Sequence, residues 1–164
     1  MNLIFHTVFS VSTSPVISKK IVKSDKTLKY LGLGFISNII MHGVMDLVPH
    51  DYPITTMMDV FISFALFFLA IIFVKKEFRS AVFFCFLGGA LPDLVDKGFF
   101  RVLRMNSIKL FPWHWSNVIN FFYKWYKHNW LFTMGNILAI VVSLCLLWAN
   151  RKFIFKSMAK YINS

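Results

Sequence analysis

The sequence predicts an all-α, polytopic membrane protein, folded as a bundle of four to five helices. Of its 164 residues, 57% are hydrophobic and 18% aromatic, and its mean hydropathy is +0.63. A soluble domain of this length could not bury so much apolar surface without leaving large exposed patches. The length fits one domain rather than two, so we expect residues 1–164 to form a single membrane-embedded helical domain.

Four apolar runs predict the main helices. Residues 130–149, WLFTMGNILAIVVSLCLLWA, are uncharged and long enough to cross ~30 Å of hydrocarbon as a helix. Residues 30–48 and 57–74 are nearly as long, although the first run carries several polar side chains. Residues 81–91 form a shorter run that meets Pro92, which predicts a tilted or partly inserted helix.

The two remaining segments differ in composition. The first eighteen residues are rich in Ser and Thr and lack a basic region followed by a cleavage site, so we expect a fifth helix inside the bundle rather than a signal peptide. Residues 97–129 alternate charges with many aromatics. This pattern is typical of a segment at the membrane surface, and loop aromatics that pack on the bundle are an equal alternative.

The basic residues indicate membrane lipids as partners and no contact with nucleic acid. The net charge is +11, but the Lys and Arg residues lie between apolar runs rather than on one basic face. With five helical passes, twelve of these residues fall on one side of the membrane and six on the other. The positive-inside rule puts the set of twelve in the cytoplasm.

The acidic residues and histidines follow the opposite division. Five acids fall at the non-cytoplasmic ends of the passes, namely Asp46, Asp51, Asp59, Asp93 and Asp96. All five histidines map to that same side, namely His6, His42, His50, His114 and His128. The orientation was assigned from Lys and Arg alone, so the placement of these acids and histidines on one side is an independent observation. We therefore expect one polar site on the non-cytoplasmic side.

The stretch MHGVMDLVPHDYP, residues 41–53, is the first candidate for metal binding. Four residues advance a helix by only about 40°, so Asn38, His42 and Asp46 form one polar stripe, with His50 just beyond Pro49. An imidazole and a carboxylate at positions i and i+4 can reach the same ion. The alternative is a hydrogen-bonded helix end at the membrane interface.

The stretch GGALPDLVDKG, residues 88–98, is the second candidate. Asp93 and Asp96 are three residues apart, close enough on a helix end to share a cation or polarise a water. The alternative is an ordinary capping Asp, with Asp96 paired to Lys97 or Arg101. Of the other histidines, His114 lies between two tryptophans and is most simply interfacial.

These motifs resemble a known family. The segments HTVFSV, SNIIMHGVMDLVPHDYP and GGALPDLVDK are similar to the YdjM-type family of bacterial inner-membrane proteins, described as membrane-bound, metal-dependent hydrolases. The resemblance implies a multi-pass protein of the bacterial inner (cytoplasmic) membrane. The matching positions are His6, His42, Asp46, His50, Asp93 and Asp96.

The chain departs from the family pattern at two places. Lys97 stands where many relatives carry a His ligand after Leu-Pro-Asp, and KHNWLFT replaces a longer Gly-His-Arg-Gly-x-Thr-His-Ser element. His128 and Thr133 are the residues of that second element that this chain retains.

The leading hypothesis is a metal-dependent hydrolase that acts on a lipid or other phosphoester-like substrate. His42, Asp46, His50 and Asp93 would hold a divalent ion, with His6 as a further ligand, and Asp96 or His128 would handle protons. A His-rich set favours zinc, with Mn²⁺ or Mg²⁺ possible because carboxylates contribute equally. The alternative is a non-catalytic membrane protein, either an ion-binding or transport protein or a scaffold or regulator, that uses the same polar cluster.

Overall fold

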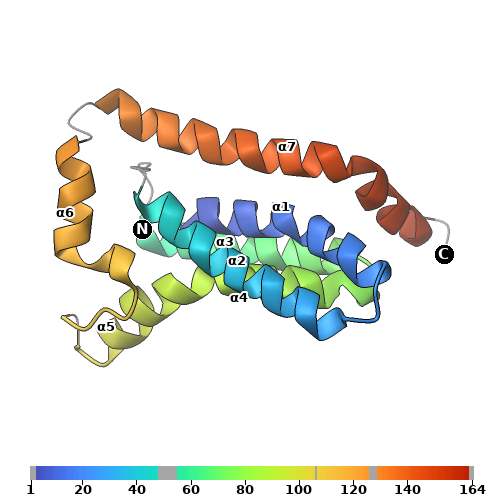
Figure 1. Ribbon diagram of the computed structural model, residues 1–164, viewed down its shortest axis with the longest axis horizontal. Coiled ribbons are helices and arrows are strands. Elements are labelled where there is room, and N and C mark those ends of the chain that lie inside the picture. The colour runs from blue at the N-terminus through green and yellow to red at the C-terminus, as the bar shows by residue number, and fades with distance from the viewer. Residues whose placement is uncertain (1–2, 48–54, 106, 126–128, 163–164) are drawn as a thin grey trace.

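The fold is a bundle of long helices. The computed structural model describes residues 3–47, 55–105, 107–125 and 129–162, and these residues contain helices and no strand. The long helices are α1 (Leu3–Val22), α2 (Thr27–Leu47), α3 (Thr56–Phe73), α4 (Arg79–Asp93) and α7 (Asn129–Ile162). In Figure 1, α1 to α4 lie side by side and α7 runs along the outside of α1. The predicted all-α bundle is confirmed.

Helix α4 lies at the centre and contacts both α1 and α2. Two consecutive glycines allow this close approach. A Cβ atom on Gly88 would lie 2.2 Å from the backbone oxygen of Phe35 in α2, and one on Gly89 would lie 1.9 Å from the Ser10 hydroxyl oxygen in α1. A side chain at either position would therefore push the helices apart, and small residues are the usual solution where membrane helices pack tightly.

Within the described residues, four helical stretches are long and apolar enough to cross a membrane: Thr27–Leu47, Thr56–Phe73, Lys76–Phe99 and Gly135–Phe155. Their outward faces carry large apolar side chains that are more than half exposed, including Ile40, Phe61 and Trp148. Exposed apolar surface on this scale is unfavourable in water and favourable in lipid. The helices therefore have the surface of a membrane protein.

The short apolar run of residues 81–91 belongs to a longer helical stretch that continues past Pro92. The structure continues from η1 (Lys76–Phe78) through α4 and into a π-helical segment, η2 (Leu94–Phe99). Proline removes its own backbone N–H and crowds the carbonyl of Gly88, but the N–H of Leu94 still donates to the carbonyl oxygens of Ala90 and Leu91. The helix thus passes Pro92, and a π-helical turn, a feature that often marks functional sites, follows from Leu94.

Helix α1 forms the predicted fifth helix inside the bundle, in contact with α2, α3, α4 and α7. Its first turn is capped by Asp59, at the start of α3. The Asp59 carboxylate accepts the backbone N–H groups of Leu3 at 2.9 Å and of Ile4 at 3.0 Å. A carboxylate at a helix N-terminus satisfies free donors and complements the helix dipole. This contact joins the beginnings of α1 and α3 at one end of the bundle.

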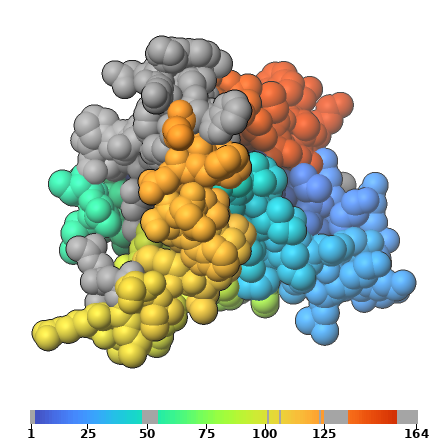
Figure 2. Space-filling model, turned by 60° about the vertical axis from the view of Figure 1, so that its left-hand side comes forward, coloured from blue at the N-terminus to red at the C-terminus, as the bar shows by residue number. Residues whose placement is uncertain are grey.

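The two ends of the bundle differ in charge. The last turn of α1 holds Lys19 and Lys20, and Lys75 and Lys76 precede α4 at the same end. At the other end α2 and α4 finish, and α5 (Phe100–Val102), η3 (Pro112–His114) and α6 (Ser116–Trp125) follow. Figure 2 shows this yellow-to-orange segment in front of the helices. The polar cluster described below thus lies at the end opposite these four lysines, although Lys97 and Lys109 lie beside it.

Candidate metal centre

Four side chains from three elements converge at the end of the bundle opposite the lysines. They are His42 and Asp46 in α2, Asp93 at the end of α4, and His114 in η3. One nitrogen or oxygen from each lies within 4.8 Å of all the others. His42, Asp93 and His114 are buried, and the Asp46 side chain is 11% exposed.

The spacing of these atoms suits a small metal ion. Asp46 Oδ2 lies 3.2 Å from His42 Nε2 and 2.8 Å from His114 Nε2. Asp93 Oδ1 lies 3.7 Å from His42 Nε2 and 3.4 Å from His114 Nε2. Ligands about 2.0–2.1 Å from a tetrahedral zinc ion stand roughly 3.3 Å apart, so the four measured distances bracket the required value.

The second nitrogen of each imidazole fixes which atom faces the site. His42 Nδ1 lies 2.6 Å from the carbonyl oxygen of Gly89, which can only accept, so Nδ1 carries a proton and Nε2 is the nitrogen available to a metal ion. His114 Nδ1 lies 2.8 Å from Asp96 Oδ2 in the same way. Metal-ligating histidines are typically held by such a carbonyl or carboxylate behind the ring.

Asp96 also builds the loop that carries His114. Its carboxylate accepts the backbone N–H of Leu110 at 2.8 Å and of Phe111 at 3.0 Å, and Lys109 Nζ donates to its carbonyl oxygen at 2.6 Å. Asp96 is itself fully buried in the π-helical segment η2. The wider turn thus directs one carboxylate toward a loop eighteen residues later in the chain.

Trp113 packs the loop that carries His114 against α2. A Cβ atom on Gly43 would lie 2.6 Å from the Trp113 ring, so the indole occupies the space that a side chain would fill. The indole centroid lies 6.3 Å from the centroid of the His42 ring. Gly43 and Trp113 therefore set the distance between α2 and η3, and with it the distance from His42 to His114.

His6 completes the wall of the site from α1. Its Nε2 lies 3.0 Å from Asp46 Oδ1, whereas His42 and His114 face Oδ2. Its ring stacks on that of His42, with centroids 3.8 Å apart and planes inclined by 19°. His6 can orient Asp46 and His42 together.

Lys97 supplies a positive charge within the cluster. Its Nζ lies 2.5 Å from Asp93 Oδ1 and 3.8 Å from Asp46 Oδ2, and its side chain is 31% exposed.

The same carboxylates change the pKa of His114. Burial would lower it, but hydrogen bonds with Asp46, Asp93 and Asp96 raise the pKa of His114 to about 9. The cluster therefore favours a cation, either a protonated side chain or a metal ion.

The donor atoms themselves fit a divalent ion. Asp93 is fully buried, and among the described residues its Oδ2 atom makes no hydrogen bond, whereas Lys97 Nζ and His114 Nε2 approach its Oδ1 atom. Buried polar atoms normally have hydrogen-bond partners, and a group without one signals strain, catalysis or an ion. Two imidazole nitrogens and two carboxylate oxygens are a ligand set that Zn²⁺ and Mn²⁺ accept.

The structure brings together most of the residues that the sequence singled out. His42, Asp46 and Asp93 lie in the cluster, His6 contacts Asp46, and Asp96 contacts His114. His50 and His128 lie outside the described residues, as does Asp51. Among the described acids, Asp59 lies at the same end of the bundle but caps α1.

His114 is the residue that motif reasoning missed. Its position between two tryptophans suggested an interfacial side chain, whereas it is 6% exposed and belongs to the four converging side chains. The signal that could have found it was the charge map, which put all five histidines on the acidic side.

A polar hollow reaches the cluster at His114. It is lined by Ser107, Lys109, His114, Trp115 and Ser116. His114 thus faces the metal-binding atoms through Nε2 and forms part of an open wall with its ring. The hollow offers a route by which water or a polar group approaches the site.

Comparison of the chain with protein-family models, with curated proteins and with solved structures finds no match in any of the three. The resemblance to YdjM-type proteins therefore stays a prediction, and functional inference depends on the site itself.

Proposed function

We propose that the protein is a membrane-bound, metal-dependent hydrolase that acts on a lipid or other phosphoester-like substrate. The single observation that carries the proposal is the convergence of His42 Nε2, Asp46 Oδ2, Asp93 Oδ1 and His114 Nε2. Both imidazoles are held from behind by acceptors, which is the arrangement that metal-ligating histidines use.

In this proposal the four converging side chains hold the ion. Two imidazoles favour zinc, and two carboxylates make Mn²⁺ or Mg²⁺ an alternative. A divalent ion supplies Lewis acidity, which activates water at neutral pH and polarises a phosphoryl or carbonyl oxygen. His6 keeps Asp46 in place through its contact with Oδ1, and His50 stays a further candidate ligand in the undescribed part of the chain.

Asp96 has a positioning role rather than the proton-handling role first considered. Its carboxylate already accepts from Leu110 N, Phe111 N and His114 Nδ1. These three hydrogen bonds hold both carboxylate oxygens against the loop and the His114 ring. We therefore assign proton transfer to His128, which lies outside the described residues, and the orientation of His114 to Asp96.

The location of the site supports a substrate at the membrane surface. Asp46 lies one residue before the end of α2, and Asp93 lies in the last two turns of the candidate span Lys76–Phe99. The adjoining hollow is polar and includes Lys109, whose charge suits an anionic group. With the lysines of the opposite end in the cytoplasm, the site lies on the non-cytoplasmic side of a bacterial inner membrane.

Lys97 favours a second candidate, a non-catalytic scaffold or regulator. Its ammonium is 2.5 Å from Asp93 Oδ1, so it neutralises a carboxylate without any metal.

A function in ion transport has less support than either of these two candidates. Buried hydroxyls continue along α1, but Ser12, Ser14 and Ser18 donate to carbonyl oxygens of their own helix, and the described buried ionisable residues gather at one end of the bundle.

Hydrolysis of synthetic phosphoesters, followed by chromatographic detection of the products, tests the proposal. Detergent-purified protein would be loaded with Zn²⁺ or Mn²⁺ and given phosphatidic acid, phosphatidylglycerol or a soluble phosphodiester. We expect turnover of at least one substrate that is lost with chelator and in the variant Asp93→Asn. A metal-loaded, folded protein without turnover of any phosphoester would refute hydrolysis of this substrate class and leave the non-catalytic candidate.

A further inference from the structure

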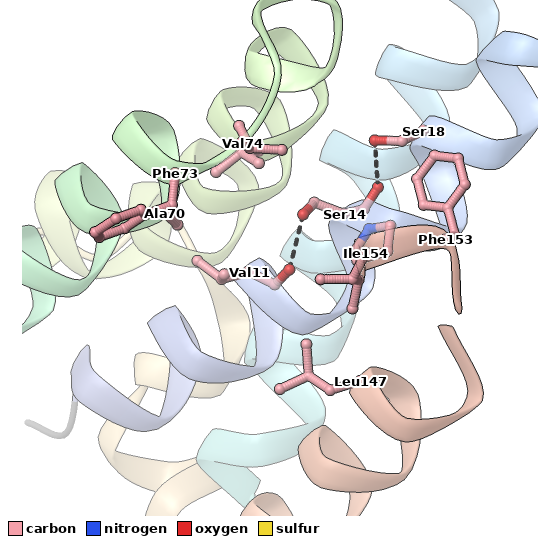
Figure 3. A pocket seen from close by; sticks show the side chains of 11 residues that line it. Val11, Ser14, Ser18, Ala70, Phe73, Val74, Leu147, Phe153 and Ile154 are labelled. Carbon is pink, nitrogen blue, oxygen red and sulfur yellow. Dashed lines mark hydrogen bonds between the residues drawn. The ribbon is translucent and has the colours of Figure 1, made fainter. Parts of the chain in front are cut away.

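A second, apolar hollow lies away from the polar cluster, between α1, α3, α4 and α7. Figure 3 shows side chains from these helices turned toward a common space. The wall includes Val11, Pro15, Ala70, Val82, Leu147 and Ile154. Such a wall binds hydrocarbon rather than a polar ligand.

The two serines in this wall do not change its character. Ser14 donates its hydroxyl proton to the carbonyl oxygen of Val11 at 2.8 Å, and Ser18 donates to the carbonyl oxygen of Ser14 at 2.9 Å, as Figure 3 shows. Both protons are used within α1. An apolar occupant therefore leaves neither hydroxyl proton without an acceptor.

A basic hollow adjoins the apolar one. It is lined by Lys19, Val22, Lys23, Lys75, Glu77 and Phe78, and Phe153 lines both hollows. Lys19 Nζ lies 5.8 Å from the centroid of the Phe153 ring. Three lysines face one glutamate, so the basic hollow carries a net positive charge.

The apolar wall passes directly into the basic one along two chain segments. Ser18 lines the first hollow and Lys19 the second, and the same change occurs from Val74 to Lys75. Val74 and Lys75 fall between the candidate spans Thr56–Phe73 and Lys76–Phe99, where a membrane–water interface is expected. The apolar hollow thus extends into the membrane, and the basic hollow lies at its surface.

We propose that these two hollows form one binding site for an anionic phospholipid. One acyl chain lies between α1, α3, α4 and α7, and the phosphate lies among Lys19, Lys23 and Lys75. Charge complementarity selects the anionic headgroup, since each lysine near a membrane surface attracts an anionic lipid. Inorganic phosphate would fill only the basic half. The site does not depend on the metal centre at the other end of the bundle.

Native mass spectrometry of the full chain tests this site. Detergent-purified protein is mixed with equimolar phosphatidylglycerol and phosphatidylcholine that carry identical acyl chains. We expect preferential retention of phosphatidylglycerol by the wild type. The double variant Lys19→Gln/Lys75→Gln should lower the ratio of the two adducts by roughly fivefold for each lysine removed.

The chain offers matched controls for both halves. Lys20 and Lys76 are exposed neighbours outside the basic hollow, so Lys20→Gln/Lys76→Gln removes the same charge and should keep the preference. Ala70→Phe fills the apolar hollow and should remove bound lipid of both kinds, whereas Leu69→Phe, at a position 49% exposed, should not. Millimolar inorganic phosphate should leave the lipid adduct in place.

Three results would overturn the proposal. Equal retention of the two lipids by the wild type would remove the headgroup preference. An equal loss in both double-lysine variants would reduce that preference to general attraction by a basic surface. Full lipid retention by Ala70→Phe would show that no acyl chain occupies the hollow between the four helices.

Discussion

The Nζ atom of Lys97 lies 2.5 Å from Asp93 Oδ1, the same oxygen that faces His42 and His114. An ammonium and a divalent ion cannot both occupy that position without repulsion. The two candidate functions therefore differ in what Lys97 does. In a hydrolase the metal ion would displace the Lys97 ammonium from Asp93, and in a scaffold the ammonium would stay beside Asp93 in place of a metal ion.

Replacing Lys97 by Met should strengthen metal binding. The substitution removes a positive charge beside two ligand oxygens, and we expect at least about a tenfold gain in Zn²⁺ affinity, because like charges about 4 Å apart in a protein repel by several kcal/mol. Competition with a fluorescent chelator measures the affinity. Lys124→Met, at an exposed position in α6, is the charge-matched control.

The thermal stability of Lys97→Met, measured with and without Zn²⁺, distinguishes the hydrolase from the scaffold. Without metal, Lys97→Met leaves the buried Asp93 carboxylate uncompensated and should lower the midpoint of thermal unfolding. Added Zn²⁺ should restore the midpoint if the site binds metal. A loss of stability that no divalent ion restores would favour the scaffold.

Asp96→Asn should weaken metal binding without removing a ligand. The amide keeps the size of the side chain but is a poorer acceptor for His114 Nδ1, and loss of such a partner typically costs about 10–100-fold in metal affinity. The readout is the dissociation constant for Zn²⁺, with Asp25→Asn, an exposed acid at the basic end, as the control. Identical affinities for Asp96→Asn and the wild type would show that Asp96 only shapes the loop.

Gly88→Ala should destabilise the bundle strongly. The new Cβ would lie 2.2 Å from the backbone oxygen of Phe35, so α2 and α4 must separate, and overpacking of this kind costs about 1–3 kcal/mol or more. Gly32→Ala in α2 is the matched control, since nothing lies within 4 Å of its Cβ. The control should gain up to about 1 kcal/mol from helix propensity.

Thermal unfolding in detergent compares the two glycine variants with the wild type. A Gly88→Ala variant as stable as Gly32→Ala would contradict the close packing of α2 against α4.

The helices and the gathering of Asp and His could be predicted from the sequence because both follow from one-dimensional patterns. Apolar runs give the helices α2, α3 and α7, and the four-residue spacing of His42 and Asp46 puts both side chains on one face. The distribution of Lys and Arg then orients the chain. None of these steps requires knowledge of tertiary contacts.

The course of the chain after Pro92 and the role of His114 could not be predicted in this way. The helix continues because the Leu94 N–H keeps its regular partner, the carbonyl oxygen of Ala90, although Pro92 has no N–H to donate. His114 joins the site because Asp96 holds the backbone at Leu110 and Phe111, and because Trp113 fits against Gly43. Both contacts join residues that are distant in sequence and follow no period.

Metal content of the purified protein tests the central claim most directly. Elemental mass spectrometry would compare the wild type with His42→Ala, Asp93→Asn and the control Asp25→Asn after reloading with Zn²⁺ or Mn²⁺. The account predicts close to one equivalent of metal in the wild type and the control, and loss of the metal in both site variants. A folded wild type that retains no divalent ion after reloading would contradict it.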